Sequence, residues 1–305
     1  MHDCALPRHC LSSVQLAWAL ACLKLADRIN RTLSPPAYPQ HLALRCKKPT
    51  MTETLVNAST PVDGVRVLAL NRPSKRNALS QELIGLLLEH LTAASSDKSV
   101  RAIVITGSST FFCAGADIKE ISNLDGEEAR RVRYLEDLCL GLRSVRKPLL
   151  AAVEGMALGG GFEVALMCDM IFASSASQFG LPEVSIGLLP GAGGTQRLTS
   201  AVGKFKAMQM ILLGTPITAS DAKSAGLVAQ VVEPGTVLET AVQTASKLAG
   251  MSTSAISLAK EAICRADDLG RDDEFERSLY YYAIGSKDKR EGVGAFLEKR
   301  SPRWD

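Results

Sequence analysis

The sequence predicts an α/β fold in which a core of alternating strands and helices is followed by a mainly helical C-terminal region. From residue 65 onward, short apolar or β-branched runs alternate with segments of helical periodicity. After residue 194 the segments are helical, and one apolar run at 227–233 interrupts them. Strands that alternate with helices form right-handed β-α-β crossovers, so a parallel sheet is expected.

The first two strands flank a helix with a clear start signal. VRVLAL (65–70) and VRAIVITG (100–107) are apolar and β-branched, which is typical of buried strands. Between them, Ser80 is expected to cap a helix over QELIGLLLEHLTAA, because its hydroxyl can accept a hydrogen bond from an amide of the first turn.

The middle of the chain is expected to hold one long helix and one long strand. After a loop at 108–126, the segment 127–146 has a helical pattern, which Pro148 ends. LLAAVEGMAL (149–158) is typical of an apolar strand. A short helix is expected from about Glu163.

The last third is expected to be helical except for the strand LVAQVVE. MIFASS (170–175) supplies one more strand of the core before this region begins. The expected helices are TQRLTSAVG, KAMQMILLG, ASDAKSAG, VLETAVQTASKLAG, SAISLAKEAICRA and EFERSLYYYAIG.

The composition is that of an ordinary globular protein with a distinct N-terminal segment. The 305 residues are 46% hydrophobic and 22% charged, enough for one large domain or two small ones. Residues 1–50 hold seven Lys or Arg and two Asp, whereas the remainder holds 28 basic and 30 acidic residues. Because the remainder is nearly neutral, no nucleic-acid partner is expected.

We expect residues 1–60 to be an extension, followed by a core at 61–250 and a helical region at 251–305. The extension is basic, poor in acids and contains serine, which is typical of mitochondrial transit peptides. This favours the mitochondrial matrix, with the cytoplasm or peroxisome as alternatives. A disordered tail and a true start at Met51 are open interpretations. The apolar run is too short for a membrane span.

Cysteines and histidines give no basis for a metal site. The eight cysteines include no C-x-x-C pair, so buried free thiols in a reducing compartment are expected. His90 is the last of four histidines, and it falls in the helix after Ser80. Neither zinc nor the histidine base of a serine hydrolase is therefore expected. The glycine-rich stretches 155–161 and 191–196 lack the G-K-[ST] of a phosphate-binding loop.

Two small-residue loops are candidates for binding a carbonyl oxygen. GMALGGGFEVALMCD (155–169) and FCAGADIKE (112–120) each lead from an apolar strand into a helical turn, where backbone amides are unobstructed. Together they could donate two amides to one oxygen. Glu163 and Glu183, in apolar surroundings, are candidates for general acid and base. On composition alone, a first-turn helix residue and a solvated loop residue are the commoner explanations.

Taken in order, these segments resemble the crotonase superfamily and, within it, the enoyl-CoA hydratases. The resemblance covers residues 62–305. The matching motifs are NRPSKRNALS, FCAGADIKE, ALGGGFEVALMCD, FGLPEVSIGLLPGAGGTQRL, ASDAKSAGLV and SKDKREGVGAFLEKR. The resemblance implies a spiral core of β-β-α units. It also implies that the C-terminal helices at 251–305 are a trimerisation region, which helps to form a homotrimer or a dimer of trimers.

The resemblance also implies a substrate and catalytic residues. The substrate would be an acyl thioester of coenzyme A, and no cofactor is expected, because coenzyme A is part of the substrate. The amides of Ala116 and Gly160 would form the oxyanion hole. Glu163 would orient and deprotonate water, and Glu183 would deliver a proton to C2 of a trans-2-enoyl-CoA. Fatty-acid β-oxidation, amino-acid breakdown and secondary metabolism all stay open as pathways.

Five further positions match residues that line the family's binding pocket. The resemblance places Ala114, Asp117, Ile118 and Lys119 in the loop around coenzyme A. It implies that Gly191 opens a helix beside the reacting carbons.

The sequence departs from the family pattern at two positions and leaves alternatives. Phe162 is bulkier than the usual Cys or Leu, and Glu154 replaces a more usual Asn or Asp, so the acyl chain length is left open. The alternatives are an enoyl-CoA isomerase and a hydratase of a branched substrate such as 3-methylglutaconyl-CoA. The presence of both Glu163 and Glu183 favours a hydratase, because isomerases of the family commonly keep only one of these carboxylates. An RNA-binding relative is not expected, because residues 80–96 contain no Lys or Arg, and a catalytically inactive relative is disfavoured by the matched site.

Overall fold

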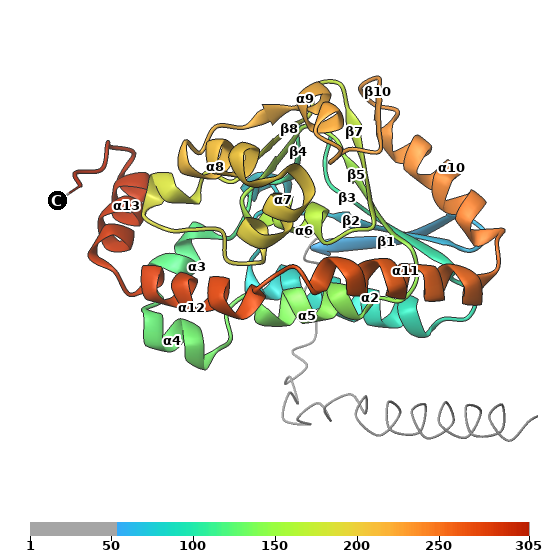
Figure 1. The fold of residues 1–305 in the computed structure, drawn as a ribbon, viewed down its shortest axis with the longest axis horizontal. Coiled ribbons are helices and arrows are strands. Elements are labelled where there is room, and N and C mark those ends of the chain that lie inside the picture. The colour runs from blue at the N-terminus through green and yellow to red at the C-terminus, as the bar shows by residue number, and fades with distance from the viewer. Residues whose placement is uncertain (1–53, 305) are drawn as a thin grey trace, which may run out of the picture. The chain divides into compact units, whose positions relative to one another are not determined.

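Two β-sheets and the helices packed on them make up residues 54–304, which the computed structural model describes (Figure 1). The strands are β1 (Val56–Val62), β2 (Val65–Leu70), β3 (Ala102–Thr106), β4 (Phe111–Cys113), β5 (Leu149–Val153), β6 (Met156–Leu158), β7 (Met170–Ser174), β8 (Gln178–Gly180), β9 (Ile217–Thr218) and β10 (Gln230–Val232). The helices are η1 (Pro73–Lys75), α2 (Gln81–Ser96), α3 (Ile118–Ser122), α4 (Gly126–Arg131), α5 (Glu136–Ser144), α6 (Gly160–Leu166), η2 (Glu183–Ile186), α7 (Gly194–Val202), α8 (Lys204–Leu212), α9 (Ala219–Ser224), α10 (Val237–Ala249), α11 (Thr253–Asp268), α12 (Asp273–Ile284) and α13 (Lys287–Glu298), of which η1 and η2 are 3₁₀ helices.

The chain alternates between the two sheets. The larger sheet has the strand order β1-β2-β3-β5-β7-β10, parallel except for β1, which pairs antiparallel with β2. The smaller sheet has the order β4-β6-β8-β9, and its last strand is antiparallel. Strands β3, β5 and β7 of the larger sheet are each followed by a strand of the smaller one, so successive turns stack as a spiral. This confirms the predicted α/β spiral with C-terminal helices.

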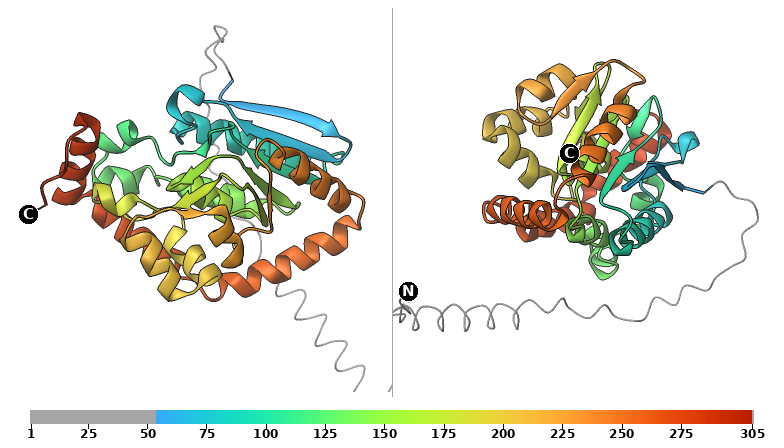
Figure 2. Two further views of the ribbon diagram at one scale, coloured as in Figure 1. Left: turned by 90° about the horizontal axis from the view of Figure 1, so that it is seen from above. Right: turned by 90° about the vertical axis from the view of Figure 1, so that its right-hand side faces the viewer.

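Each face of the larger sheet is covered by a different set of helices. On β3, Ile103 and Ile105 belong to the main apolar core that includes α2 and α5. The alternate residues Ala102 and Val104 belong to a second apolar cluster with Ala241 of α10. This alternation follows from the two-residue period of a strand. Figures 1 and 2 show α10 on one side of these strands and α2 on the other.

The start of α2 confirms its sequence signal. The hydroxyl of Ser80 accepts a hydrogen bond from the amide of Leu83 at 3.2 Å. The expected strands at β2, β3 and β7, and the expected helices from α7 to α12, also lie within a few residues of their predicted positions.

The long helix predicted over 127–146 is wrong, because the chain forms α4 and α5 with a turn between them. Arg133 and Leu135 adopt left-handed conformations with φ of 52° and 65°, which a continuous helix cannot accommodate. The turn brings Tyr134 and Leu135 into the core, where they are 1% and 4% exposed. Burial of these two side chains favours the break over helix continuity.

The long strand predicted over 149–158 is also divided. Gly155, with φ of 68°, separates β5 from β6, which belong to different sheets. A Cβ atom at Gly155 would lie 2.0 Å from the carbonyl oxygen of Thr110, so only glycine fits this crossing. The helix expected from about Glu163 begins earlier, at Gly160.

The first strand of the core begins before residue 61. Strand β1, which falls largely within the predicted 1–60 extension, pairs with β2 in a register that places Val56 opposite Leu70. The sequence of β1 lacks the apolar alternation of a buried strand, because all of its residues except the first are exposed. The predicted transit peptide lies outside the described residues, and trimerisation through 251–305 stays a prediction. Between residues 54 and 304, no helix is both long and apolar enough to span a bilayer.

Candidate active site

The three consecutive glycines each fit a different constraint. Gly159 has φ of 51°, and a Cβ atom there would lie 2.9 Å from Oε1 of Glu183. A Cβ atom on Gly161 would lie 2.3 Å from the carbonyl oxygen of Cys113, so this glycine allows α6 to pack against β4. Gly160, between them, is the first residue of α6. The glycines therefore bring a helix start close to a neighbouring loop and to a carboxylate.

Two unpaired backbone amides lie side by side at this point. A Cβ atom on Gly160 would be 3.5 Å from the amide nitrogen of Ala116, and one on Gly115 would be 3.4 Å from the amide nitrogen of Gly160. Among the hydrogen bonds of residues 54–304, neither amide donates to a protein acceptor. Leu79 anchors the loop, because its amide donates to Gly115 at 2.8 Å and its carbonyl accepts from Asp117 at 3.0 Å. Paired amides of this kind can bind one carbonyl oxygen.

Glu163 is buried and held by two amides. It is 1% exposed, and its Oε1 accepts hydrogen bonds from the amides of Ala192 and Gly194, both at 2.7 Å. Burial and the negative charge of Glu276 raise the pKa of Glu163 to about 7, while the two amides and Arg277 act in the opposite direction. A carboxyl with this pKa can be ionised near neutral pH and can accept a proton.

Glu183 has a different environment on η2. The residue is half-buried, and its Oε2 is buried without a hydrogen-bond partner among the described residues. Burial, followed by the charge of Glu163, raises the pKa of Glu183 well above its ordinary value. A Cβ atom on Gly159 would lie 2.9 Å from Oε1 of Glu183, and the carbonyl of Gly159 accepts from the amide of Glu163 at 3.0 Å, so the two predicted residues lie beside the same glycine. The negative charge of Glu163 contributes to the raised pKa of Glu183. It also favours the neutral form of Glu183 beside an ionised Glu163.

Asp117 is engaged in fixing its own loop. It forms an ion pair with Arg72 at 2.7 Å and caps α3 by accepting from the amide of Lys119 at 3.0 Å. Burial acts to raise the pKa of Asp117, but the hydrogen bonds from Arg72 and Lys119 outweigh it, so the pKa lies below its ordinary value. Asp117 is therefore ionised and positions the backbone beside Ala116.

The other residues predicted for the binding pocket are on or near this loop, except Gly191. Ala114 and Ile118 are half-buried, and Lys119 is exposed on α3. Gly191 does not open a helix as predicted, because α7 begins three residues later. A Cβ atom on Gly191 would lie 2.5 Å from the ring of Tyr280, so this glycine allows the loop before α7 to pack on α12.

The two departures from the family pattern each have a structural contact in the fold. Phe162 is fully buried, and its ring packs on Phe179 with the ring centroids 5.3 Å apart. Glu154 accepts a hydrogen bond from the amide of Gly235 at 3.1 Å.

Sequence reasoning missed Glu276, a third buried carboxylate. It lies on α12 and is 2% exposed. Its Oε1 accepts from the amide of Gly193 at 2.6 Å, and its Oε2 accepts from the amide of Thr195 at 2.8 Å and from the Thr195 hydroxyl. A signal was available, because Glu276 is spaced four residues from Tyr280 and eight from Ile284. These spacings place all three on the buried face of the helix.

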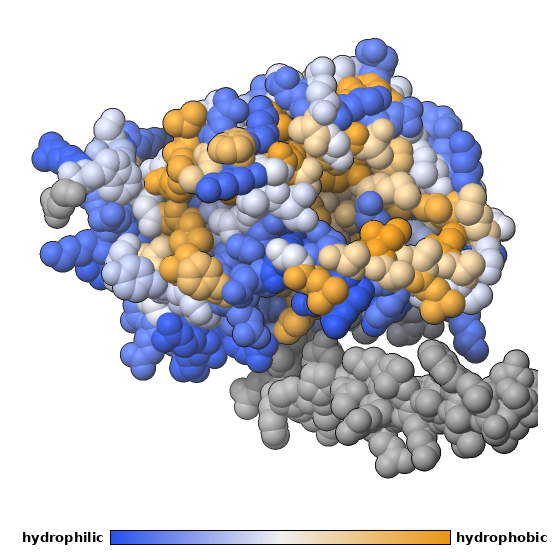
Figure 3. All heavy atoms as spheres, viewed as in Figure 1, coloured by the Kyte–Doolittle hydropathy of each residue, from blue (hydrophilic) through white to orange (hydrophobic). Residues whose placement is uncertain are grey.

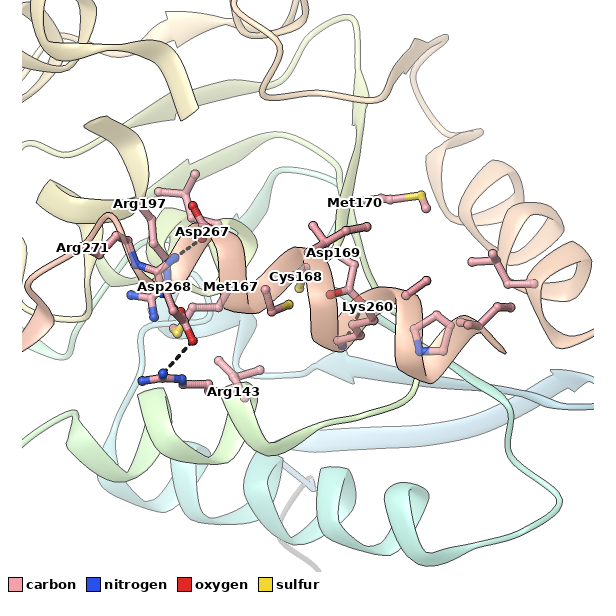
Figure 4. A pocket seen from close by; sticks show the side chains of 18 residues that line it. Arg143, Met167, Cys168, Asp169, Met170, Arg197, Lys260, Asp267, Asp268 and Arg271 are labelled. Atoms are coloured by element: carbon pink, nitrogen blue, oxygen red, sulfur yellow. Dashed lines mark hydrogen bonds and ion pairs between the residues drawn. The ribbon is translucent and has the colours of Figure 1, made fainter. Parts of the chain in front are cut away.

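A cavity of about 550 Å³ lies elsewhere, beside α11 (Figure 4). Several of its charged side chains form ion pairs: Lys260 with Asp169 at 2.8 Å, and Arg143 with Asp268 at 2.6 Å. No residue predicted for the active site lines this cavity. Neither Glu163 nor Glu183 therefore faces this cavity as a lining residue.

The chain alternates between two sheets in a spiral. Paired backbone amides and two glutamates lie together beside the three glycines. This combination defines the crotonase class. Residues 61–305 match the model of the family described as enoyl-CoA hydratase/isomerase. The chain belongs to this family.

Similar proteins support this membership. A probable enoyl-CoA hydratase of Rhizobium meliloti (strain 1021) is 46% identical over 79% of this chain and 94% of its own length. A probable mitochondrial enoyl-CoA hydratase of Dictyostelium discoideum is 43% identical over 79% and 87%. The crystal structure of carnitinyl-CoA hydratase from Mycobacterium avium superposes with a TM-score of 0.74 at 35% identity, covering 83% of this chain and 99% of that one.

Proposed function

We propose that the protein is an enoyl-CoA hydratase that adds water across the 2,3 double bond of trans-2-enoyl-CoA to give 3-hydroxyacyl-CoA. The observation that carries the proposal is the contrast between two neighbouring carboxyls. Glu163 has two amide donors on one oxygen, whereas Glu183 has a buried oxygen without a partner among residues 54–304. Two carboxyls with different environments are suited to act as base and acid.

In the proposed mechanism, the amides of Ala116 and Gly160 bind the thioester oxygen and stabilise the enolate that develops on it. Glu163 removes a proton from water, and the water oxygen forms a bond to C3. Glu183 donates its proton to C2, which completes the addition. The reaction leaves Glu163 protonated and Glu183 ionised, so one proton must return to Glu183 before the next turnover. No cofactor beyond the coenzyme A of the substrate takes part.

The pair of carboxyls also favours hydration over the isomerase alternative, for which one proton-transferring carboxylate is enough. The test is hydration of crotonyl-CoA, followed by loss of the enoyl absorbance. Isomerisation of a 3-enoyl-CoA is measured in parallel. The proposal predicts rapid crotonyl-CoA hydration, and an enzyme that only isomerises the 3-enoyl substrate would contradict it.

The surface supports assembly into a homotrimer or a dimer of trimers. Large apolar side chains are exposed on α8 and α11, among them Phe205 at 90% and both Leu258 and Ile263 at 70%. Figure 3 shows apolar surface over these helices. Exposed apolar area of this kind is typical of protein interfaces. Light scattering is expected to give three or six chains per particle, and a monomer would contradict this assembly.

A mitochondrial location is supported by the basic N-terminal segment and by the mitochondrial relative from Dictyostelium discoideum. Residues 1–50 fused to a fluorescent protein are expected to direct it to mitochondria. A diffuse cytosolic signal would favour the alternative that translation starts at Met51.

A further inference from the structure

Four consecutive backbone amides before and at the start of α7 are shared between two buried carboxylates. Glu163 accepts from Ala192 and Gly194, and Glu276 accepts from Gly193 and Thr195. The two carboxylates come from different parts of the chain, α6 and α12. The loop is therefore held from two sides, and the amides on Glu163 cannot move without disturbing those on Glu276.

The conformation of the loop allows successive amides to point alternately to Glu163 and Glu276. Gly193 has φ of 90°, and a Cβ atom there would lie 1.5 Å from the guanidinium of Arg197. The same guanidinium donates to the carbonyl oxygen of Ala192 at 3.3 Å. A Cβ atom on Gly194 would lie 2.7 Å from Oε1 of Glu163. The positive φ of Gly193 therefore favours glycine there, and a side chain on Gly194 would displace the Glu163 carboxylate or Pro190.

We propose that Glu276 is a positioning residue for hydration, because it holds Gly193 and Thr195 and thereby keeps the amides of Ala192 and Gly194 on Oε1 of Glu163. The inference rests on the proposed function, since Glu163 is the base of that reaction. Glu276 acts through the loop and is not assigned a contact with substrate.

The charge of Glu276 gives it a second effect on Glu163. Gly193 and Thr195 donate hydrogen bonds to the Glu276 carboxylate, and such donors favour its ionised form. Burial raises the pKa of Glu276, while these donors and Arg277 act against the rise. The negative charge in turn raises the pKa of Glu163. The titratable and charged groups that surround the two carboxylates are Glu183, Arg277, Tyr280, Cys139 and Arg197.

Removing the charge of Glu276 should therefore have a signature that loss of packing alone does not produce. In Glu276→Gln, Glu163 loses a nearby negative charge, so its pKa falls. The acidic limb of the kcat/KM profile should move to lower pH by about one unit. At the same time kcat should fall roughly ten-fold or more with KM little changed, because the base is less well positioned.

Glu274→Gln is the matched control, because it makes the same change on the exposed face of α12. It should leave kcat and the pH profile unchanged. Hydrogen exchange measured by mass spectrometry on peptides covering 191–197 supplies a readout that does not require activity. Exchange there should accelerate in Glu276→Gln and stay at the parent rate in Glu274→Gln.

Thr195→Val provides an independent test should Glu276→Gln fail to fold. It removes the hydroxyl that donates to Glu276 but leaves the charge in place. Faster exchange at 191–197 and a several-fold lower kcat, with the acidic limb close to its parent position, would support the proposal. Parent kcat and parent exchange in this variant would overturn it.

The combined experiment separates the two proposals. A wild-type chain that hydrates no enoyl-CoA contradicts the proposed function, while the exchange rates at 191–197 still test whether Glu276 holds the loop. A wild-type chain that is active, together with a folded Glu276→Gln variant that keeps the parent kcat, acidic limb and loop exchange, overturns the role of Glu276 alone.

Discussion

The surroundings of Glu163 and Glu183 differ although both carboxyls are withdrawn from water beside glycine-rich loops. Glu163 lies in the first turn of α6 and receives two amide hydrogen bonds at 2.7 Å from the loop before α7. Glu183 begins η2, and its Oε2 has no partner within the described residues. Burial raises the pKa of both groups. The amides of Ala192 and Gly194 limit the rise at Glu163, whereas Glu183 has only its own backbone amide acting in that direction.

In the proposed mechanism, this difference in backbone amides assigns the acid and the base. The residue type is the same, and both carboxyls are within electrostatic reach of each other. Donated hydrogen bonds stabilise the ionised form, so Glu163 ionises first and Glu183 keeps its proton. The account therefore predicts that each carboxyl has a distinct role, and the following changes test that contrast.

The largest effect is expected from replacing either carboxyl by its amide. Glu163→Gln and Glu183→Gln should each lower kcat for crotonyl-CoA by roughly 10²–10⁴-fold, with a smaller effect on KM, because each removes one proton transfer. If the transfers belong to one concerted step, the double variant should be little slower than the slower single variant. Steady-state kinetics on folded variants measures this. Parent activity in either single variant would refute the hydratase account.

Removing one oxyanion amide should have a slightly smaller effect. Gly160→Pro deletes the amide hydrogen, and such a loss typically costs about 2.7–4 kcal/mol of transition-state stabilisation, or roughly 10²–10³-fold in kcat. Gly160 is the first residue of α6, a position at which proline is tolerated. Circular dichroism and light scattering establish that the variant folds and assembles. A folded variant with full activity would exclude this amide.

Displacing the Glu163 carboxylate should cost somewhat less. In Gly194→Ala the new methyl group would lie 2.7 Å from Oε1 of Glu163, so the carboxylate must shift and kcat should fall by about 10²-fold. Gly85→Ala on α2 is the control, because no atom lies within 4 Å of its new methyl group. The two variants are compared by kcat and thermal denaturation. Equal kcat values would show that the fit around Glu163 is unimportant.

The pH dependence should show opposite trends for activity and stability. Activity should fall about ten-fold per unit below pH 7, because Glu163, with a pKa of about 7, must be ionised to act as base. Its folded pKa is raised above the unfolded value, so the unfolded chain releases this proton first as pH rises. The contribution of Glu163 to stability should therefore decrease between about pH 4.5 and pH 7. Denaturation of the parent and Glu163→Gln over this window isolates the contribution, and parallel curves would contradict the raised pKa.

The smallest effect is expected at the N-terminus. Deleting residues 1–50 should leave thermal stability and activity unchanged, because β1 begins at Val56 and the family match begins at residue 61. Thermal denaturation and crotonyl-CoA hydration check this. A clear loss of stability would show that the segment belongs to the folded core.

The sequence was sufficient for elements with strong local signals, whereas the catalytic glutamate pair follows from the family resemblance and stays a prediction. Ser80 caps α2 as its position before an apolar helix predicts. The smaller sheet was harder to predict, because its strands are two or three residues long and β6 is separated from β5 only by the turn at Gly155. The break between α4 and α5 was missed because burial of Tyr134 and Leu135 is a tertiary effect that helical periodicity does not reveal.

Glu276 was missed for a related reason. The segment EFERSLYYYAIG predicts a helix with charged residues, and nothing local shows that one glutamate meets Gly193 and Thr195, about 80 residues earlier in the chain. Contacts between distant segments are the part of the site that a single sequence does not reveal.

The contrast between the two carboxyls can be measured directly by infrared difference spectroscopy at about pH 8, one unit above the pKa of Glu163. Subtracting the spectrum of each glutamine variant from that of the parent shows which form of the carboxyl was lost. The account predicts that Glu163→Gln removes a carboxylate band and that Glu183→Gln removes the band of a neutral carboxylic acid. Loss of a carboxylate band in Glu183→Gln would contradict the assignment of Glu183 as the acid.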